Sequence, residues 1–327
     1  MTNRPTPGPR TRPLRTLTAM LAAAAALIAP VVVSSAGPAS ASSDVQYGKV
    51  VFVDDGDTID VDIAGDGTSR PVRIRYIGIQ AMELHVYSHT LSKLRGECWG
   101  VDAAKNLHRI VAGKRVQLTA LHATSHSSRN VRLRRSVAVR VNGVWTDTGA
   151  MQLDAGLALP DPLPDEYSHN LDYMRRAQTA AANHVGMWGA PQHCGIGPAA
   201  ADPLQVDVNW DADGNDSANV NGEWVDVTNN GADVVSLGGW WVRDSAYRGD
   251  KAHGYTFPAG TSVAPGEHVR LHVGHGNDDA DTLYWGLDIP IFANVTGGRQ
   301  WMSDGAYLFD PRGNLRGWYM YPCRAAC

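Results

Sequence analysis

Three carboxylates crowd one short turn in the segment VVFVDDGDTIDVDI, residues 50–63. Apolar and polar residues alternate on both sides of that turn, which is the period of a half-buried strand. An Asp-Gly pair is a common bend between two such strands, so the sequence predicts a hairpin whose bend carries Asp54, Asp55 and Asp57. Because Ca²⁺ and Mg²⁺ prefer carboxylate oxygens as ligands, this bend is a candidate cation site.

A candidate base and several arginines follow this bend along the chain. Arg75 lies in the alternating stretch VRIRYIGI, Glu83 comes shortly after it, and arginines recur at 129–135. A carboxylate can deprotonate water, and guanidinium groups can bind a phosphoryl group through paired hydrogen bonds. Together with the acidic turn, these are the residue types that hydrolysis of a phosphodiester requires.

The order and the residues of these motifs resemble those of the staphylococcal nuclease, or thermonuclease-like, family. The family pattern is D-G-D-T, then R-(x)4-D-(T/A)-P-E, then a late Arg before a strand, then G-(L/I/M)-W after a helix. This chain has Asp55-Gly56-Asp57-Thr58, then RYIGIQAME at 75–83, then Gly186-Met187-Trp188. The resemblance covers residues 46–190 and implies a Ca²⁺-dependent endonuclease that acts on DNA and RNA.

The resemblance implies a cation site built from three residues. Asp57 corresponds to a direct Ca²⁺ ligand, and Asp55 is the neighbouring acid that supports the site. Gln80 stands where the family has a second carboxylate ligand, and its side chain can offer a carbonyl oxygen but no charge. Since Ca²⁺ affinity follows the number of carboxylates, the sequence predicts a weak or altered metal site.

The resemblance also implies a catalytic set. Glu83 corresponds to the general base, while Arg75 and the late Arg stabilise the charge of the transition state. Counting back without a gap from the turn Asn142-Gly143 places the late Arg at Arg134. Arg132 and Arg135 remain rivals, because a one-residue bulge would shift the strand register.

A second hypothesis is a secreted binding protein whose barrel is a degenerate nuclease. Gln80 is the feature that favours it, and Met82, which replaces the family Pro, loosens the turn that aims Glu83. Zinc is disfavoured: the pairs His85/His89 and His122/His126 have i,i+4 spacing but lie in loop-like sequence, and the cysteines form no C-x-x-C pair.

The first 41 residues predict a secretory signal. Four arginines precede an apolar run at 20–33, and Ala39-Ser40-Ala41 has the small-residue pattern of a cleavage site. We therefore expect a secreted, extracellular protein, without a membrane span. Its four cysteines suit that compartment and allow three pairings, of which Cys98–Cys194 with Cys323–Cys327 keeps each bridge within one domain.

The remaining chain divides into two parts of different charge. Residues 42–200 carry a net charge of +1 and residues 201–327 a net charge of −9. A Gly/Pro-rich linker at 196–203 separates a predicted nuclease-like domain, 42–195, from a second domain, 204–327. Sequence periodicity in the first domain predicts strands at 47–53, 58–63, 71–79, 115–121 and 131–141, and helices at 101–111, 150–158 and 171–188.

Five strands with a helix after the third predict a small OB-fold barrel. The second domain has frequent turn signals and no convincing helix, which predicts a β-sandwich, so the fold class is mainly β. The second domain resembles the lamin-tail domain, an immunoglobulin-like sandwich with a binding or targeting role. The matching segments are NGEWV at 221–225, LGGW at 237–240, FPAGT at 257–261, and Pro265-Gly266.

Overall fold

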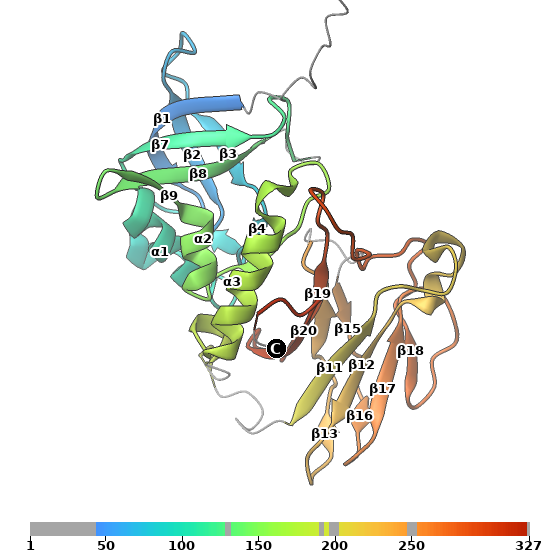
Figure 1. Ribbon diagram of the computed structural model, residues 1–327. Helices are drawn as coiled ribbons and strands as arrows, with labels where there is room; N and C mark the ends of the chain where they lie inside the picture. The colour runs from blue at the N-terminus through green and yellow to red at the C-terminus, as the bar shows by residue number, and fades with distance from the viewer. Residues whose placement is uncertain (1–43, 128–131, 190–192, 196–202, 247–253, 326–327) are drawn as a thin grey trace, which may run out of the picture. The chain divides into compact units, whose positions relative to one another are not determined.

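The structure is a computed structural model that describes residues 44–127, 132–189, 193–195, 203–246 and 254–325 (Figure 1). The predicted signal peptide, residues 1–41, and all but the last residue of the predicted linker lie outside these ranges. Within these ranges, no helix is both long enough and apolar enough to cross a membrane.

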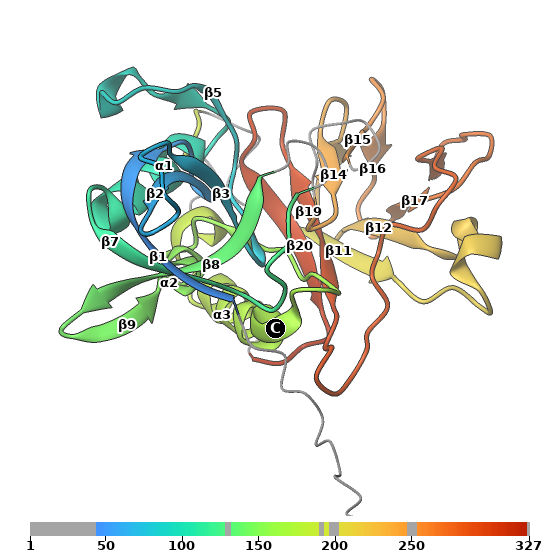
Figure 2. The same cartoon turned by 90° about the horizontal axis from the view of Figure 1, so that it is seen from above.

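The first half is built on a ring of five strands. Alternate residues such as Ile59, Val61 and Ile63 are buried inside the ring, as the period-two pattern predicts. A parallel pairing of β3 with β8 joins the two ends of an otherwise antiparallel order, and β9 extends from β8 as a hairpin (Figure 2). The predicted five-stranded, OB-type architecture is thereby confirmed. The strands are β1 (Asp44–Val53), β2 (Thr58–Ile63), β3 (Val72–Tyr76), β7 (Arg115–Ala120), β8 (Leu133–Val141) and β9 (Val144–Asp147).

Three helices and several short elements complete this half (Figure 1). The helix predicted for 171–188 is shorter than expected, because Asn183 ends it and His184 and Gly186 have φ of 54° and 58°. A Cβ at residue 186 would lie 2.4 Å from the Gly156 carbonyl oxygen, so only glycine fits there. The elements are α1 (Gly100–Val111), α2 (Thr148–Asp154), α3 (Asn170–Ala182), β4 (Ile79–Gln80), β5 (Leu84–Val86), β6 (Arg95–Gly96), β10 (Leu159–Pro160), η1 (Leu91–Lys93), η2 (Tyr167–His169) and η3 (Gly186–Trp188).

The second half is a sandwich of two four-stranded sheets. Its core contains Val225, Leu237, Trp240 and Leu271, each at most 1% exposed. One sheet has the order β11 (Leu204–Asn209), β12 (Trp224–Asn229), β17 (His268–His272), β18 (Thr282–Tyr284). The other has the order β15 (Gly254–Thr256), β14 (Trp241–Arg243), β19 (Asp304–Phe309), β20 (Leu315–Tyr321). Smaller elements are β13 (Val235–Ser236), β16 (Ser262–Val263), η4 (Asp216–Ala218) and η5 (Val220–Gly222).

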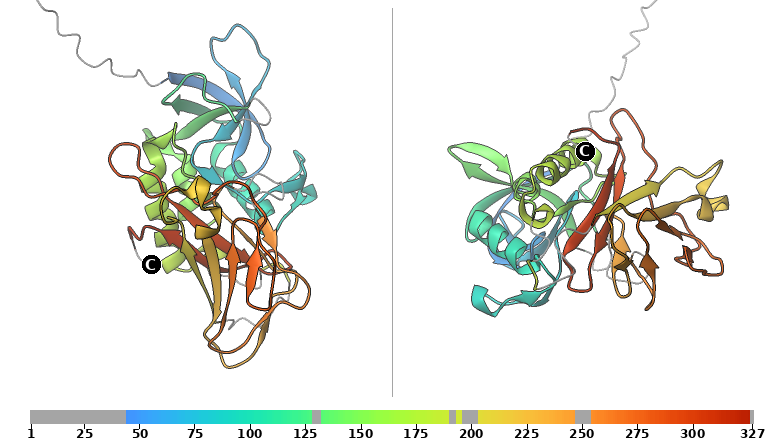
Figure 3. Two further views of the ribbon diagram at one scale, coloured as in Figure 1. Left: turned by 90° about the vertical axis from the view of Figure 1, so that its right-hand side faces the viewer. Right: turned by 90° about the horizontal axis from the view of Figure 1, so that it is seen from below.

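Strand β19 is buried on both faces and belongs to two cores. Ala306 and Leu308 pack into the core of the sandwich, whereas Tyr307 and Phe309 pack into the core of the first half. Successive side chains of a strand point to opposite faces, so this one strand joins both cores. Figure 3 shows the red strands of this sheet beside the green helix α3.

A disulfide also ties the chain together. The predicted bridge between Cys98 and Cys194 is confirmed, with an S–S distance of 2.01 Å. Cys323 is also disulfide-bonded, but its predicted partner Cys327 lies outside the described residues. A disulfide is compatible with an extracellular protein, and secretion itself stays a prediction.

Candidate functional site

The acidic turn between β1 and β2 is held by its own backbone. The Asp54 and Asp55 N–H groups both donate to the Thr58 carbonyl, and the Asp57 N–H donates to Asp55 Oδ1 at 2.9 Å. The turn also lies against its neighbours, because a Cβ on Gly56 would come within 2.5 Å of the Ala81 and Ala103 side chains. Glycine is thus required at this position, and the carboxylates around it are fixed in place.

Asp57 joins this turn to the two segments that follow it. Its Oδ1 accepts from the Thr58 hydroxyl at 3.0 Å and lies 2.9 Å from Arg75 Nη1. Its Oδ2 accepts from the Ala81 N–H at 2.7 Å, just beyond β4. Both oxygens of Asp57 are therefore bonded within the protein.

Gln80 links the predicted base to the predicted arginine. Its Oε1 accepts a hydrogen bond from Arg75 Nη2 at 2.6 Å, and its Nε2 donates to Glu83 Oε1 at 3.1 Å. Four of the residues singled out from the sequence thus form one bonded chain in the order Asp57, Arg75, Gln80, Glu83. Asp55, also singled out from the sequence, is bonded to the Asp57 backbone.

Burial changes the acidity of these carboxyl groups. The pKa of Glu83 is raised by its half-buried position and by the charge of Asp57, against an opposing effect of Arg75. The pKa of Asp55 is raised well above its usual value by burial and then by the charges of Asp57 and Glu83. A carboxylate with a raised pKa accepts a proton more readily, which is the property of a general base.

The three candidate late arginines occupy different surroundings. Arg134 on β8 is the register partner of Arg75 on β3, and its side chain is 21% exposed. Because register partners in parallel strands present their side chains on the same face, the two guanidinium groups belong to one face of the sheet. Arg135 points the other way and is 1% exposed, bonded to Asp44 and Gln46. Arg132 donates to the Thr58 hydroxyl at 3.3 Å.

Two further carboxyl groups lie at this site. Asp161 Oδ2 is 4.0 Å from Arg75 Nη2, and burial raises the pKa of Asp161 to about 6 although the charges of Arg75 and Arg134 act to lower it. Glu97 Oε2 accepts from the Glu83 N–H at 3.0 Å. Neither residue was identified from the sequence, because each reaches the site only through the folding of the chain.

The donor set around Asp57 can be compared with what a calcium ion needs. Ca²⁺ takes about six to eight oxygen ligands. Among the described residues, no group of three or more His, Cys, Asp or Glu side chains is placed to hold a metal ion. The Arg75 guanidinium bonds the oxygens of Asp57 and Gln80 that the resemblance assigns to calcium. This arrangement does not fit the ion, and the predicted Ca²⁺ requirement stays untested.

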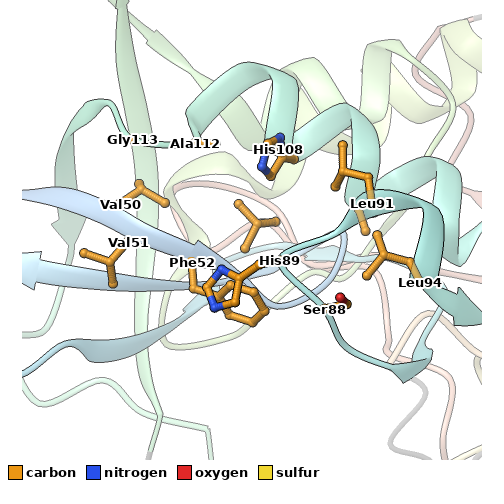
Figure 4. A pocket seen from close by; sticks show the side chains of 12 residues that line it. Val50, Val51, Phe52, Ser88, His89, Leu91, Leu94, His108, Ala112 and Gly113 are labelled. Carbon is orange, nitrogen blue, oxygen red and sulfur yellow. The ribbon is translucent and has the colours of Figure 1, made fainter.

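A small pocket between β1 and α1 contains one of the histidines considered for zinc. It has a volume of about 50 Å³, with His89 and His108 on its wall (Figure 4). The His89 ring lies 4.4 Å from the Phe52 ring, centroid to centroid. His89 thus packs against an aromatic ring, and this pocket offers no set of metal ligands within the described residues.

The second half contains the apolar positions expected from its motifs. Leu237, Trp240 and Phe257 are at most 1% exposed and pack into the sandwich core. Residues 199–323 match the family model named Lamin Tail Domain. The tryptophans of this lamin-tail domain serve packing: Trp240 lies in its core, and Trp224 is covered by the Arg270 guanidinium, 3.9 Å from the ring centroid.

The match to the lamin-tail model begins at residue 199, so it covers the second half and not the five-strand ring. No curated protein matches the chain.

Proposed function

We propose that the first half is a phosphodiester hydrolase that cleaves nucleic acid, DNA or RNA, outside the cell, and that the lamin-tail domain is an accessory module. One observation carries this proposal. Glu83, Gln80, Arg75 and Asp57 form a bonded chain, and Arg134 is the register partner of Arg75. A carboxylate base linked to one of two arginines that share a sheet face is an arrangement that can catalyse phosphodiester hydrolysis.

Glu83 is the proposed general base. Its Oε1 accepts a hydrogen bond from Gln80, and Glu97 holds its backbone N–H, so the carboxylate has a fixed position. In this role it takes a proton from a water molecule as the water oxygen forms a bond to phosphorus. The bond from phosphorus to the leaving oxygen then breaks, and that oxygen takes a proton from solvent water.

The two arginines are proposed to stabilise the charge that develops on the phosphoryl oxygens. Arg75 has five N–H donors and uses three on Asp57, Gln80 and the Tyr76 carbonyl, which leaves two without a hydrogen bond among the described residues. Arg134 has one distant ion pair, 4.0 Å from the exposed Asp165, so its charge is also available. Such donors act mainly on the transition state.

The experiment that tests this proposal is a cleavage assay with the full mature chain. Supercoiled plasmid and a labelled single-stranded RNA are incubated with the protein, once with Ca²⁺ and once with a chelator. Glu83→Gln keeps the shape of the side chain and removes the base, and Lys105→Gln on the exposed face of α1 is the matched control. Loss of cleavage in the first variant alone supports the proposal, and the two metal conditions test the implied calcium requirement separately.

A second candidate function is a non-catalytic binding protein. The observation that favours it is the enclosure of Arg75, which is 8% exposed and bonded to both Asp57 and Gln80. If no nucleic acid is cleaved under any metal condition while the chain is folded, this second function is preferred.

A further inference from the structure

The outer face of the ring carries a group of aromatic and cationic side chains away from the site described above. The strand register places them together: Arg115 pairs with Lys49, Arg140 pairs with Trp145, and Gln117 pairs with Tyr47. Arg115 and Gln117 are two apart on β7, so their side chains share one face. We call the following residues the outer patch: Tyr47, Lys114, Arg115, Arg140 and Trp145, which line an open pocket of about 530 Å³.

The two rings and two of the cations of the outer patch hold one another in place. The Arg115 guanidinium lies 5.2 Å from the Tyr47 ring centroid, and the Arg140 guanidinium lies 4.8 Å from the Trp145 centroid. The two ring centroids are 5.8 Å apart. Both cations sit within the range at which a ring face attracts a positive charge. This mutual support orders long side chains that would otherwise be mobile in solvent.

The positive charge of the outer patch is not neutralised locally. Within the described part of the chain, no carboxylate forms an ion pair with Lys114, Arg115 or Arg140. No acidic residue lines the pocket, although the whole chain has a net charge of −4. An unpaired group of three cations attracts an anion, and the adjoining rings offer flat apolar surface for stacking.

We propose that the outer patch binds single-stranded nucleic acid, with phosphates on the three cations and bases stacked on Tyr47 and Trp145. Base stacking on aromatic side chains beside a cationic surface is how single strands are held without sequence preference. This inference deepens the proposed function and rests on it for the choice of nucleic acid over another polyanion. It assigns a second contact site on the substrate, separate from the proposed cleavage site.

The position of the outer patch sets the length of substrate that can use it. Arg134 and Arg140 are both on β8 and an even number of residues apart, so they lie on the same face of that strand. Six residues of strand span about 20 Å at roughly 3.3 Å per residue. A dinucleotide is too short to reach from one arginine to the other, whereas a longer strand can contact both. The outer patch therefore favours long substrates.

The test measures binding directly, so it does not depend on cleavage. A fluorescein-labelled twelve-residue oligothymidylate is titrated into the mature Glu83→Gln protein at several salt concentrations. Changing Lys114, Arg115 and Arg140 to Gln removes three phosphate contacts, so the slope of log K against log salt should fall by about 2. Trp145→Ala should weaken binding roughly 5- to 150-fold at fixed salt. The control variant Lys105→Gln changes an exposed cation on α1 and should behave as the parent protein.

Several outcomes would overturn this inference. Unchanged affinity in the triple variant, or in Trp145→Ala, removes the outer patch as a strand-binding site. If Trp145→Ala weakens the binding of a blunt-ended duplex as much as that of the oligothymidylate, no base stacks on Trp145. If heparin binds through these cations and the oligothymidylate does not, the partner is an anionic polysaccharide.

Hydrolysis of bis(4-nitrophenyl) phosphate separates this inference from the proposed function. The small substrate cannot reach the outer patch, so the triple variant on the catalytically intact chain should hydrolyse it at the parent rate. Absence of hydrolysis in the parent protein counts against the proposed function alone, because strand binding is scored without cleavage. A reduced rate in the triple variant shows that these cations act at the cleavage site, which overturns their assignment to a separate one.

Discussion

Arg75 on β3 and Arg134 on β8 are register partners across the one parallel pairing of the five-strand ring, within the described residues. The chain between them includes α1 and β7, so only the closure of the ring brings the two guanidinium groups to the same face. Arg75 Nη2 lies 4.0 Å from Asp161 Oδ2, and the charges of both arginines act to lower the pKa of Asp161. The pair is thus placed by the architecture of the ring itself.

This register predicts which arginine matters for cleavage. Arg134→Lys keeps the charge but loses the planar fork, and it should lower the cleavage rate by about 10²- to 10³-fold without loss of stability. Arg135→Lys should instead lower the free energy of unfolding by about 1–3 kcal/mol, because this buried side chain bonds Asp44 and Gln46. Cleavage rates and thermal denaturation of both variants check the assignment. A severe rate loss in a stable Arg135→Lys protein would show that the register argument is wrong.

The environment of Glu83 predicts a pH dependence. Its pKa is raised, so the base is lost to protonation at a higher pH than for a free glutamate, and kcat/KM should fall on the acid side from that raised pKa. Glu97 contributes to this shift. Glu97→Gln keeps an oxygen for the Glu83 N–H and removes the charge, so it should move the acid limb of the profile to lower pH. A profile that stays in place in Glu97→Gln contradicts the assignment of Glu83 as the base.

How far these residues could be predicted depends on how local their positioning is. Asp57, Arg75 and Glu83 are brought together by one hairpin and the strand after it, so their spacing in the sequence was sufficient. Arg134 was placed by an ungapped match to the thermonuclease-like pattern, counted back from Asn142-Gly143, a tight hairpin turn whose φ values are 49° and 83°. Their roles in catalysis stay predictions.

Other features could not be read from the sequence because they depend on contacts between distant segments. Asp161 and Glu97 lie in stretches without a motif and meet the site only in the folded chain. The sharing of β19 between two cores was missed as well. Its residues DGAYLF are all buried, and a run without alternation is what a strand covered on both faces shows.

The bonded position of Gln80 predicts what a carboxylate would do there. Gln80→Asp removes the donor to Glu83 and adds another acid near Asp57, so the variant should bind Ca²⁺ more tightly than the parent protein. Without metal, its cleavage rate should be lower than that of the parent, because the added charge raises the pKa of Glu83 further. Calorimetric titration with Ca²⁺, beside cleavage assays with a chelator, measures both effects. Identical Ca²⁺ titrations for variant and parent would exclude Gln80 from any metal site.

Asp54 predicts a dependence of stability on pH. Burial and then the charge of Asp60 raise its pKa from 3.8 to about 7, although Arg73 lies 2.5 Å away. The folded chain therefore binds more protons at this group than the unfolded chain between those two values. Its contribution to stability is complete below pH 3.8 and is lost as the pH rises through about 7.

Asp54→Asn removes this titration, so the stability of the variant relative to the parent should rise between pH 4 and pH 8. Each unit by which folding raises the pKa corresponds to about 1.4 kcal/mol in the free energy of unfolding. Asp60→Asn keeps Asp54 but removes its neighbour's charge, and it should give a smaller pH dependence than the parent. Urea denaturation across this pH range measures the free energy of unfolding of each protein. Parallel curves of this free energy against pH for the parent and Asp54→Asn would refute the raised pKa of Asp54.

The shared core makes Gln178 a test of the connection between the two halves. This residue on α3 is 1% exposed; its Nε2 donates to the Pro322 carbonyl at 2.9 Å, and its Oε1 accepts from the Arg324 N–H at 2.8 Å. Gln178→Ala removes the side-chain partner of both of these backbone groups near the C-terminal end of the described chain. Because the two lost hydrogen bonds are part-buried, the variant should unfold more easily by about 1–3 kcal/mol at most. Thr179→Ala, on the exposed face of the same helix, should change stability little.

Because Tyr307 and Phe309 pack into the first-half core, the parent protein should unfold in a single transition that both halves share. Two separate transitions in calorimetry, with Gln178→Ala affecting neither, would mean that the halves fold independently.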